Sequence, residues 1–227
     1  MPRIPRRRLG TGVFHVWNRA HDRRYVFDTE EDKQVFLSLL AERKRGLKLN
    51  IYHWALLSNH FHIAIEALSV ADLSRYIGKS CELYSRYWRK KHGGSGTLWQ
   101  GRFKSCLVQK EGYLTRLGRY IERNPVRAGL CERPWDTPWC SARCYVDAHD
   151  DDLVRVHDHS MYMEMGRDDQ ERSIRYRDYL LTDRERADDE ELFRAHRPVI
   201  GDENFLAQAV YTIGRFISRR VGRPRKS

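Results

Sequence analysis

The stretch YHWALLSNHFHIAI, residues 52–65, decides the fold, because it predicts two adjacent β-strands joined by a tight turn. It is rich in the β-branched and aromatic residues that favour strands, and Ser58-Asn59 has the composition of a turn. Successive side chains of a strand point to opposite faces, so His60 and His62 share one face. Two neighbouring imidazoles form half of a divalent-metal site. Two ordinary half-buried histidines give the same pattern, so the motif alone does not distinguish a metal site from a structural pair.

A second group of polar residues lies in residues 111–130, whose apolar positions recur at helical spacing. Tyr120 and Asn124 are four residues apart and therefore lie one turn apart along the edge of this apolar stripe. On a helix packed against the sheet, Tyr120 would supply a nucleophile and the Asn124 amide oxygen a third metal ligand. Tyr113, on the same helix face, is the competing nucleophile. The arginines of this helix fall on one basic flank: Arg116, Arg119 and Arg123.

Periodicity in the rest of the N-terminal region predicts the order strand, helix, strand, strand, helix, strand before the Tyr120 helix. The strands are expected at residues 12–18, 47–57, 60–67 and 98–108, and the helices at residues 29–45 and from residue 69 onward. Thr29 or Asp28 is expected to cap the first helix, and Ser69 with Asp72 to form a capping box on the second. This order predicts an α+β meander of the split-βαβ kind.

Positive charge is concentrated in the region that carries these motifs. Residues 1–130 hold 25 Lys and Arg against 11 Asp and Glu, whereas residues 131–227 hold 17 against 20. A positive surface attracts phosphates and releases counterions on binding, so nucleic acid is the expected partner. We expect a domain at residues 1–145, an acidic, mainly helical extension at residues 146–218 and a basic tail at residues 219–227.

The tail contains Gly222-Arg223-Pro224, which is similar to an AT-hook, an extended element that places arginine in a narrow minor groove. A tail with only electrostatic affinity for DNA is an equal alternative. Elsewhere, His157 and His159 repeat the His-x-His spacing amid acidic residues without a strand pattern, so we expect them in a solvated loop. The five cysteines lack a C-x-x-C pair, which favours free thiols over disulfides or zinc ligands. No signal peptide or membrane span is expected.

Several motifs together resemble those of the single-tyrosine HUH transposases, specifically the REP-associated tyrosine transposases of bacteria. They are residues 1–3 (MPR), 13–19 (VFHVWNR), 60–62 (HFH), 98–105 (LWQGRFKS) and 119–129 (RYIERNPVRAG). The resemblance covers roughly residues 1–145. It implies a ferredoxin-like βαββαβ antiparallel sheet with helices on one face, followed here by the helical C-terminal extension.

The resemblance also implies an enzyme that nicks and rejoins single-stranded hairpin DNA through a 5′-phosphotyrosine intermediate. It makes Tyr120 the nucleophile and His60 and His62 metal ligands. The polar ligand one turn past the tyrosine maps onto Asn124, where related enzymes carry Gln or Glu. Two imidazoles and one amide oxygen favour Mg²⁺ or Mn²⁺.

The expected partner is single-stranded, hairpin-forming DNA, bound by a monomer or homodimer in the cytoplasm in association with the nucleoid, with no membrane contact. A domesticated DNA-binding regulator with an idle site is the alternative, and an RNA-binding module on the same sheet is a third. The sequence has no RNP-like strand with exposed aromatics, which disfavours RNA binding. The residues expected to bind DNA are Arg3, Arg6, Arg7, Arg8, Arg102, Lys104, Arg116, Arg119, Arg123, Arg127, Arg223 and Arg225.

Overall fold

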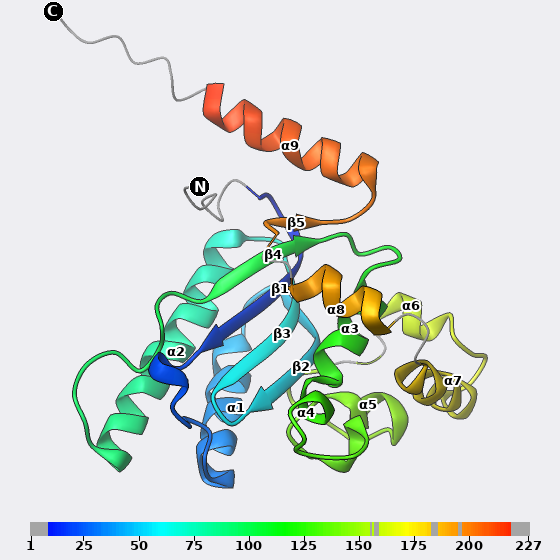
Figure 1. The fold of residues 1–227 in the computed structure, drawn as a ribbon. Coiled ribbons are helices and arrows are strands. Elements are labelled where there is room, and N and C mark those ends of the chain that lie inside the picture. The colour runs from blue at the N-terminus through cyan, green and yellow to red at the C-terminus, as the bar shows by residue number, and fades with distance from the viewer. Residues whose placement is uncertain (1–8, 155, 157–158, 183–185, 195–196, 219–227) are drawn as a thin grey trace, which may run out of the picture.

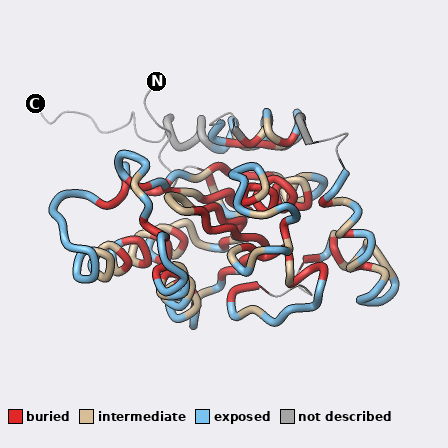
Figure 2. Tube along the Cα trace, turned by 60° about the horizontal axis from the view of Figure 1, so that its bottom comes forward, coloured by how far each residue is buried: buried red, intermediate tan, exposed pale blue. Residues whose placement is uncertain are grey.

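A five-stranded sheet forms the centre of the protein (Figure 1). The computed structural model describes residues 9–218 except residues 155, 157–158, 183–185 and 195–196. The strand order is β2-β3-β1-β4-β5, antiparallel except that β5 runs parallel to β4. The strands are β1 (Gly12–Arg19), β2 (Leu49–Leu57), β3 (His60–Ala67), β4 (Lys104–Val108) and β5 (Val199–Ile200). Figure 2 shows the buried residues concentrated in these central strands.

Two long helices, α1 (Glu30–Lys44) and α2 (Val70–His92), cover one face of the sheet. Thr29 caps α1 in a full capping box with Asp32, whose carboxylate accepts the Thr29 backbone N–H. The aromatic ring of Phe36 on α1 packs against Phe61 of β3, with centroids 5.0 Å apart. The residues on either side of Phe61 must therefore point to the opposite face of the sheet.

That opposite face is covered by α3 (Leu114–Glu122) and α4 (Asn124–Arg127), and further helices lie next to these two (Figure 1). These further helices are α5 (Ala142–Val146), α6 (Ser160–Met163), α7 (Asp169–Leu181) and α8 (Arg186–Arg194), with 3₁₀ turns at His21–Arg23 and Pro134–Asp136. The last helix, α9 (Glu203–Ser218), extends away from the sheet beyond β5 (Figure 1). No helix in the described ranges is long and apolar enough to cross a membrane.

The predicted α+β class and the order of its first six elements are confirmed. The strand predicted at residues 98–108 is shorter and begins at Lys104, because Gly101 has a φ of 153° and the chain before it follows an irregular path. The sequence analysis missed β5, whose two residues lie within the C-terminal extension and are too few to show alternation.

A buried polar network fixes α3 to β2 and to the extension. Nδ1 of His53 donates to Glu122 on α3 at 2.9 Å, and the other ring nitrogen of His53 shares a 3.1 Å hydrogen bond with His159. Ser141 and Tyr176 also donate to Glu122. The prediction of a solvated loop is wrong for His159, which is 0% exposed, and His157 lies outside the described residues.

Candidate active site

The first candidate ligand, His60, begins β3 and is held by the residue before it. Nδ1 of His60 donates to the side-chain oxygen of Asn59 at 2.6 Å. The orientation of that amide is fixed, since its nitrogen donates to the backbone oxygen of Arg23 at 3.0 Å. Nε2 of His60 is therefore its nitrogen without a proton. Burial, and then the charges of Arg19 and Arg127, lower the pKa of His60 to about 4, so the ring is neutral at pH 7.

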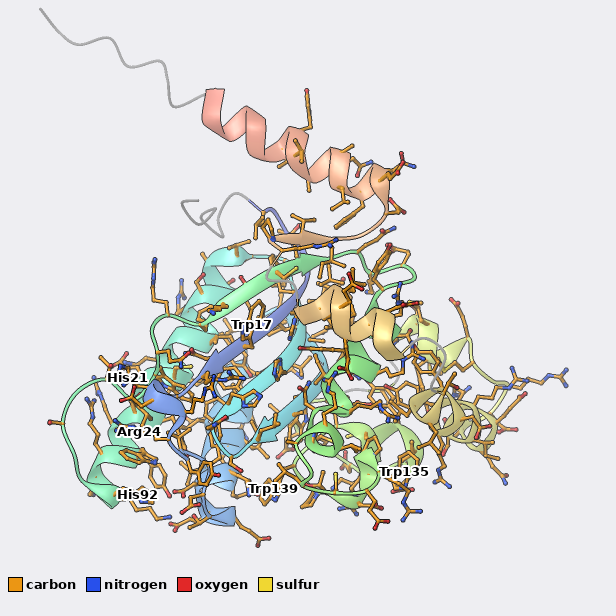
Figure 3. The ribbon with its side chains drawn as sticks, viewed as in Figure 1. Trp17, His21, Arg24, His92, Trp135 and Trp139 are labelled. Atoms are coloured by element: carbon orange, nitrogen blue, oxygen red, sulfur yellow. The ribbon has the colours of Figure 1, made fainter. Side chains whose placement is uncertain are left out.

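The second candidate ligand, His62, lies on the same face of β3 and contacts a third histidine. Its Nδ1 shares a 2.9 Å hydrogen bond with Nε2 of His15 on the neighbouring strand β1. Burial, followed by the charge of His15, places the pKa of His62 well below its usual range. The ring of Trp17 stacks on His15 with centroids 4.7 Å apart, and Figure 3 shows Trp17 on β1. The motif search missed His15, although its position two residues before Trp17 places it on this face.

Helix α3 brings Tyr120 over these imidazoles. Its ring meets His62 edge-on, with centroids 5.8 Å apart, and His15 likewise at 5.6 Å. The guanidinium of Arg127 lies over the Tyr120 ring at 4.5 Å and donates to the Tyr120 backbone oxygen at 2.7 Å. Tyr113 precedes the first residue of α3, and its ring packs against Arg116. The structure thus brings Tyr120 to His62, one of the two predicted imidazoles, and to His15, which was not predicted.

Asn124 follows at the junction of α3 and α4. Its side-chain nitrogen donates to the backbone oxygens of Tyr120 and Ile121 at 2.8 and 3.2 Å. This leaves the side-chain oxygen as the Asn124 atom suited to bind a cation.

The residues present fit a divalent ion. The ring centroids of His60 and His62 are 5.2 Å apart, so both rings are close enough to supply ligands to one divalent ion. The amide oxygen of Asn124 completes the expected donor set. Within the described part of the chain, His, Cys, Asp and Glu alone form no metal-binding group of three.

Helix α8 covers Tyr120 and its surrounding arginines. Phe193 packs against the Tyr120 ring with centroids 5.4 Å apart, and Tyr120 is only 7% exposed. The buried carboxylate of Asp189 accepts hydrogen bonds from Arg116 and Arg119 at 2.7 and 2.8 Å. On the same helix, Glu190 forms an ion pair with Arg127 at 3.2 Å. Acidic groups of α8 therefore neutralise three arginines close to Tyr120 in the chain.

Two arginines of the predicted basic flank are buried in the structure. Arg119 is 1% exposed, and Arg123 is buried and donates to the backbone oxygen of Leu180. Both are covered by residues more than fifty positions later in the chain, and helical periodicity contains no information about such contacts.

Arg102 and Lys104 are exposed as expected, and pairing of Lys104 with Trp17 places Lys104 on the imidazole face. The sequence analysis missed Arg19, an exposed residue paired with His60 across the two strands. The remaining predicted DNA-binding residues lie outside the described ranges: Arg3, Arg6, Arg7, Arg8, Arg223 and Arg225.

Comparison with known proteins identifies the family. Residues 11–124 match the model of IS200-like transposases, and this segment contains every residue of the site just described except Arg127 and those of α8. The chain belongs to the IS200-like transposase family. The predicted family is thereby confirmed, and with it a relationship to DNA-transposing enzymes. A search of curated proteins gives no match to this transposase.

Among solved structures, the transposase fold is similar to one described as the structure of a REP-associated tyrosine transposase bound to a REP hairpin. The TM-score is 0.53 at 19% sequence identity, over 69% of this chain and 90% of that chain. At this identity the likeness concerns the fold.

Proposed function

We propose that this IS200-like transposase nicks and rejoins single-stranded hairpin DNA, with Tyr120 as the nucleophile. The observation that carries the proposal is the position of the Tyr120 ring against the buried imidazoles of His62 and His15 on one face of the sheet. The similarity in fold to a transposase described as bound to a REP hairpin supports hairpin DNA as the substrate class.

The reaction proposed is a transesterification at phosphorus. The side-chain oxygen of Tyr120 forms a bond to phosphorus and loses its proton, while the bond from phosphorus to the 3′ oxygen breaks and that oxygen gains a proton. The products are a 5′-phosphotyrosine and a free 3′-hydroxyl. Because one phosphoester replaces another, rejoining needs no nucleotide cofactor. The guanidinium of Arg127 lies over the Tyr120 ring, which supports a role for it in binding the reacting phosphate in exchange for its ion pair with Glu190.

His60, His62 and Asn124 would hold Mg²⁺ or Mn²⁺. An ion held by these residues would supply Lewis-acid polarisation of the scissile phosphate and would stabilise the charge that develops on it. A neutral ring with an unprotonated Nε2 is what ligation requires, and the Asn59 contact gives His60 that form.

Covalent trapping tests this proposal. The purified protein is incubated with labelled single-stranded hairpins and Mg²⁺, and covalent adducts are separated on a denaturing gel. Tyr120→Phe is expected to abolish both cleavage and adduct, because it removes the attacking oxygen and no charge. Tyr113→Phe is the matched control, since it removes the same atom from a ring seven residues away, and it should keep both.

DNA affinity should be nearly equal in the wild type and in both tyrosine variants. An adduct located on Tyr113 by mass spectrometry, or undiminished cleavage by Tyr120→Phe, would show that the nucleophile is assigned incorrectly.

A further inference from the structure

Each of the two proposed histidine ligands has a partner on its Nδ1 atom. For His60 the partner is the side-chain oxygen of Asn59, which accepts hydrogen bonds and never donates them. Because the amide nitrogen of Asn59 is bound to the backbone oxygen of Arg23, the amide cannot turn round without losing that hydrogen bond. The contact therefore places the His60 proton on Nδ1 and leaves Nε2 without one.

For His62 the partner is His15, and two proton arrangements fit the 2.9 Å contact. If Nδ1 of His62 donates to His15, Nε2 of His62 has no proton and is able to bind a cation. If Nε2 of His15 donates instead, the His62 proton lies on Nε2 and blocks ligation. His15 is 2% exposed, lies between the rings of Trp17 and His62, and is held by its strand in register with Ala64. These contacts fix the His15 ring so that its Nε2 faces Nδ1 of His62, and the arrangement in which His15 accepts is the one that leaves Nε2 of His62 able to bind a cation.

We propose that Asn59 and His15 are positioning residues, which accept the Nδ1 protons of His60 and His62 and so direct both Nε2 atoms toward one divalent cation. The inference rests on the proposed metal site and adds two residues to it. Metal-bound histidines generally donate their second ring N–H to such a partner, and removal of that partner commonly weakens metal affinity ten- to a hundredfold.

The proton positions can be measured without any metal. In metal-free protein carrying ¹⁵N-labelled histidine, two-dimensional ¹H–¹⁵N spectra distinguish protonated from unprotonated ring nitrogens, with the signals assigned through His60→Gln and His62→Gln. The expected result is a proton on Nδ1 in both rings. In His15→Phe the His62 signals should shift toward the Nε2-protonated form, while those of His60 stay unchanged. A wild-type His62 protonated on Nε2 would overturn the role of His15, whether or not any variant folds.

Affinity for Mn²⁺ alone, measured by calorimetry or electron paramagnetic resonance in the absence of DNA, provides the second readout. His15→Phe and Asn59→Ala are each expected to weaken Mn²⁺ binding ten- to a hundredfold. His15→Gln and Asn59→Asp keep an acceptor oxygen and should recover most of the affinity. His149→Gln removes an exposed histidine away from the site and should leave the affinity for Mn²⁺ unchanged.

Different results would overturn the metal site and the positioning roles of Asn59 and His15. A folded wild type that binds no Mn²⁺ would overturn the metal site itself. Wild-type binding that is unaltered in His15→Phe and Asn59→Ala would overturn only the positioning roles. Equal weakening by His15→Phe and His15→Gln would mean that ring packing, and not proton acceptance, is what His15 provides.

Discussion

Gly118 lies on α3 where the helix passes closest to the buried His53 ring, and a Cβ built at this position would be 2.5 Å from the Nε2 atom of His53. The ring cannot move aside easily, because both of its nitrogens are hydrogen-bonded, to Glu122 and to His159. The absence of a side chain at residue 118 therefore sets the distance between α3 and the sheet, and hence the height of Tyr120 above the imidazoles.

Gly118→Ala is expected to destabilise the protein, although alanine is the better helix former. The gain in helix propensity is about 1 kcal/mol, whereas overpacking of a filled core costs about 1–3 kcal/mol. Gly78→Ala in α2 is the matched control, because a Cβ there meets nothing within 4 Å, and it should stabilise the fold by about 1 kcal/mol. Urea unfolding of both variants measures the difference. If Gly118→Ala stabilised the fold as much as Gly78→Ala does, α3 would have to be free to shift away from the His53 ring.

Burial lowers the pKa of His159 to about 2, from an ordinary value of 6.5. Between these values the unfolded chain binds a proton that the folded chain does not, so stability falls as the pH falls. This one group contributes a slope of about 1.4 kcal/mol per pH unit below pH 6. His159→Gln should lower stability at pH 7 and reduce the acid slope by that amount, as measured by urea unfolding from pH 7 to pH 4. His149→Gln, at an exposed position, is the matched control for the loss of one histidine.

The sequence predicts the environment of a residue well where the local pattern determines it. The prediction is poor where contacts with distant parts of the chain determine that environment. His60 and His62 lie side by side on β3 because alternate strand residues share a face, and the Tyr120 ring meets His62. His159 was predicted to be solvated because its acidic neighbours carry no strand pattern, whereas its burial depends on His53, over a hundred positions earlier.

Among the elements, α8 has the most direct relation to the site. Its acidic first half neutralises Arg116, Arg119 and Arg127, and its Phe193 packs on Tyr120. Because Tyr120 is 7% exposed and packs against Phe193, we expect α8 to move when a DNA phosphate reaches Tyr120. The sequence predicted an acidic, helical extension here, but not where it docks, because a short helix that pairs charges with a partner shows little apolar periodicity of its own.

Asp189→Asn is expected to tighten DNA binding about tenfold, which corresponds to about 1.4 kcal/mol. The substitution removes the charge shared by Arg116 and Arg119, weakens the closed position of α8 and frees two guanidinium groups for phosphate. Fluorescence anisotropy with a labelled single-stranded hairpin measures the change. Asp188→Asn, at the exposed neighbouring position, makes the same change in net charge and should have a much smaller effect. Identical gains from both variants would indicate general charge repulsion instead of release of α8.

Across the whole molecule, the division expected at residue 146 stays a prediction, and the packing across it is extensive. Tyr145 packs against Tyr162 and Tyr176, with ring centroids 5.0 and 4.9 Å apart. The hydroxyl of Tyr176 also donates a hydrogen bond to Glu122 on α3. The sequence predicted a weakly apolar connection because these buried residues are tyrosines spread among charges. The extension thus contributes to the core behind the site, while the tail at residues 219–227 lies outside the described residues.

Deleting residues 219–227 should therefore weaken DNA binding without impairing cleavage at saturating DNA. This segment holds five cationic residues, and each single-strand phosphate that a cation neutralises adds about 0.7 to the steepness with which log affinity falls against log salt. The truncated protein should therefore show a shallower salt dependence. Binding titrations between 50 and 300 mM salt, roughly the range in which such slopes are resolved, measure the change. The double variant Arg223→Gln, Arg225→Gln in the full-length chain is the matched comparison. It should show part of the loss in affinity and part of the decrease in salt dependence.

Deleting residues 146–227 should have a different result, because it removes Tyr162, Tyr176 and His159 from the core behind α3. The cooperative unfolding transition should then disappear, together with cleavage. Deletion of residues 219–227 alone could instead abolish cleavage at saturating DNA while the unfolding transition stays intact. That result would mean that the tail takes part in the active site. The tail would then have to reach Tyr120, whose surroundings in the described structure are filled by Phe193 and Arg127.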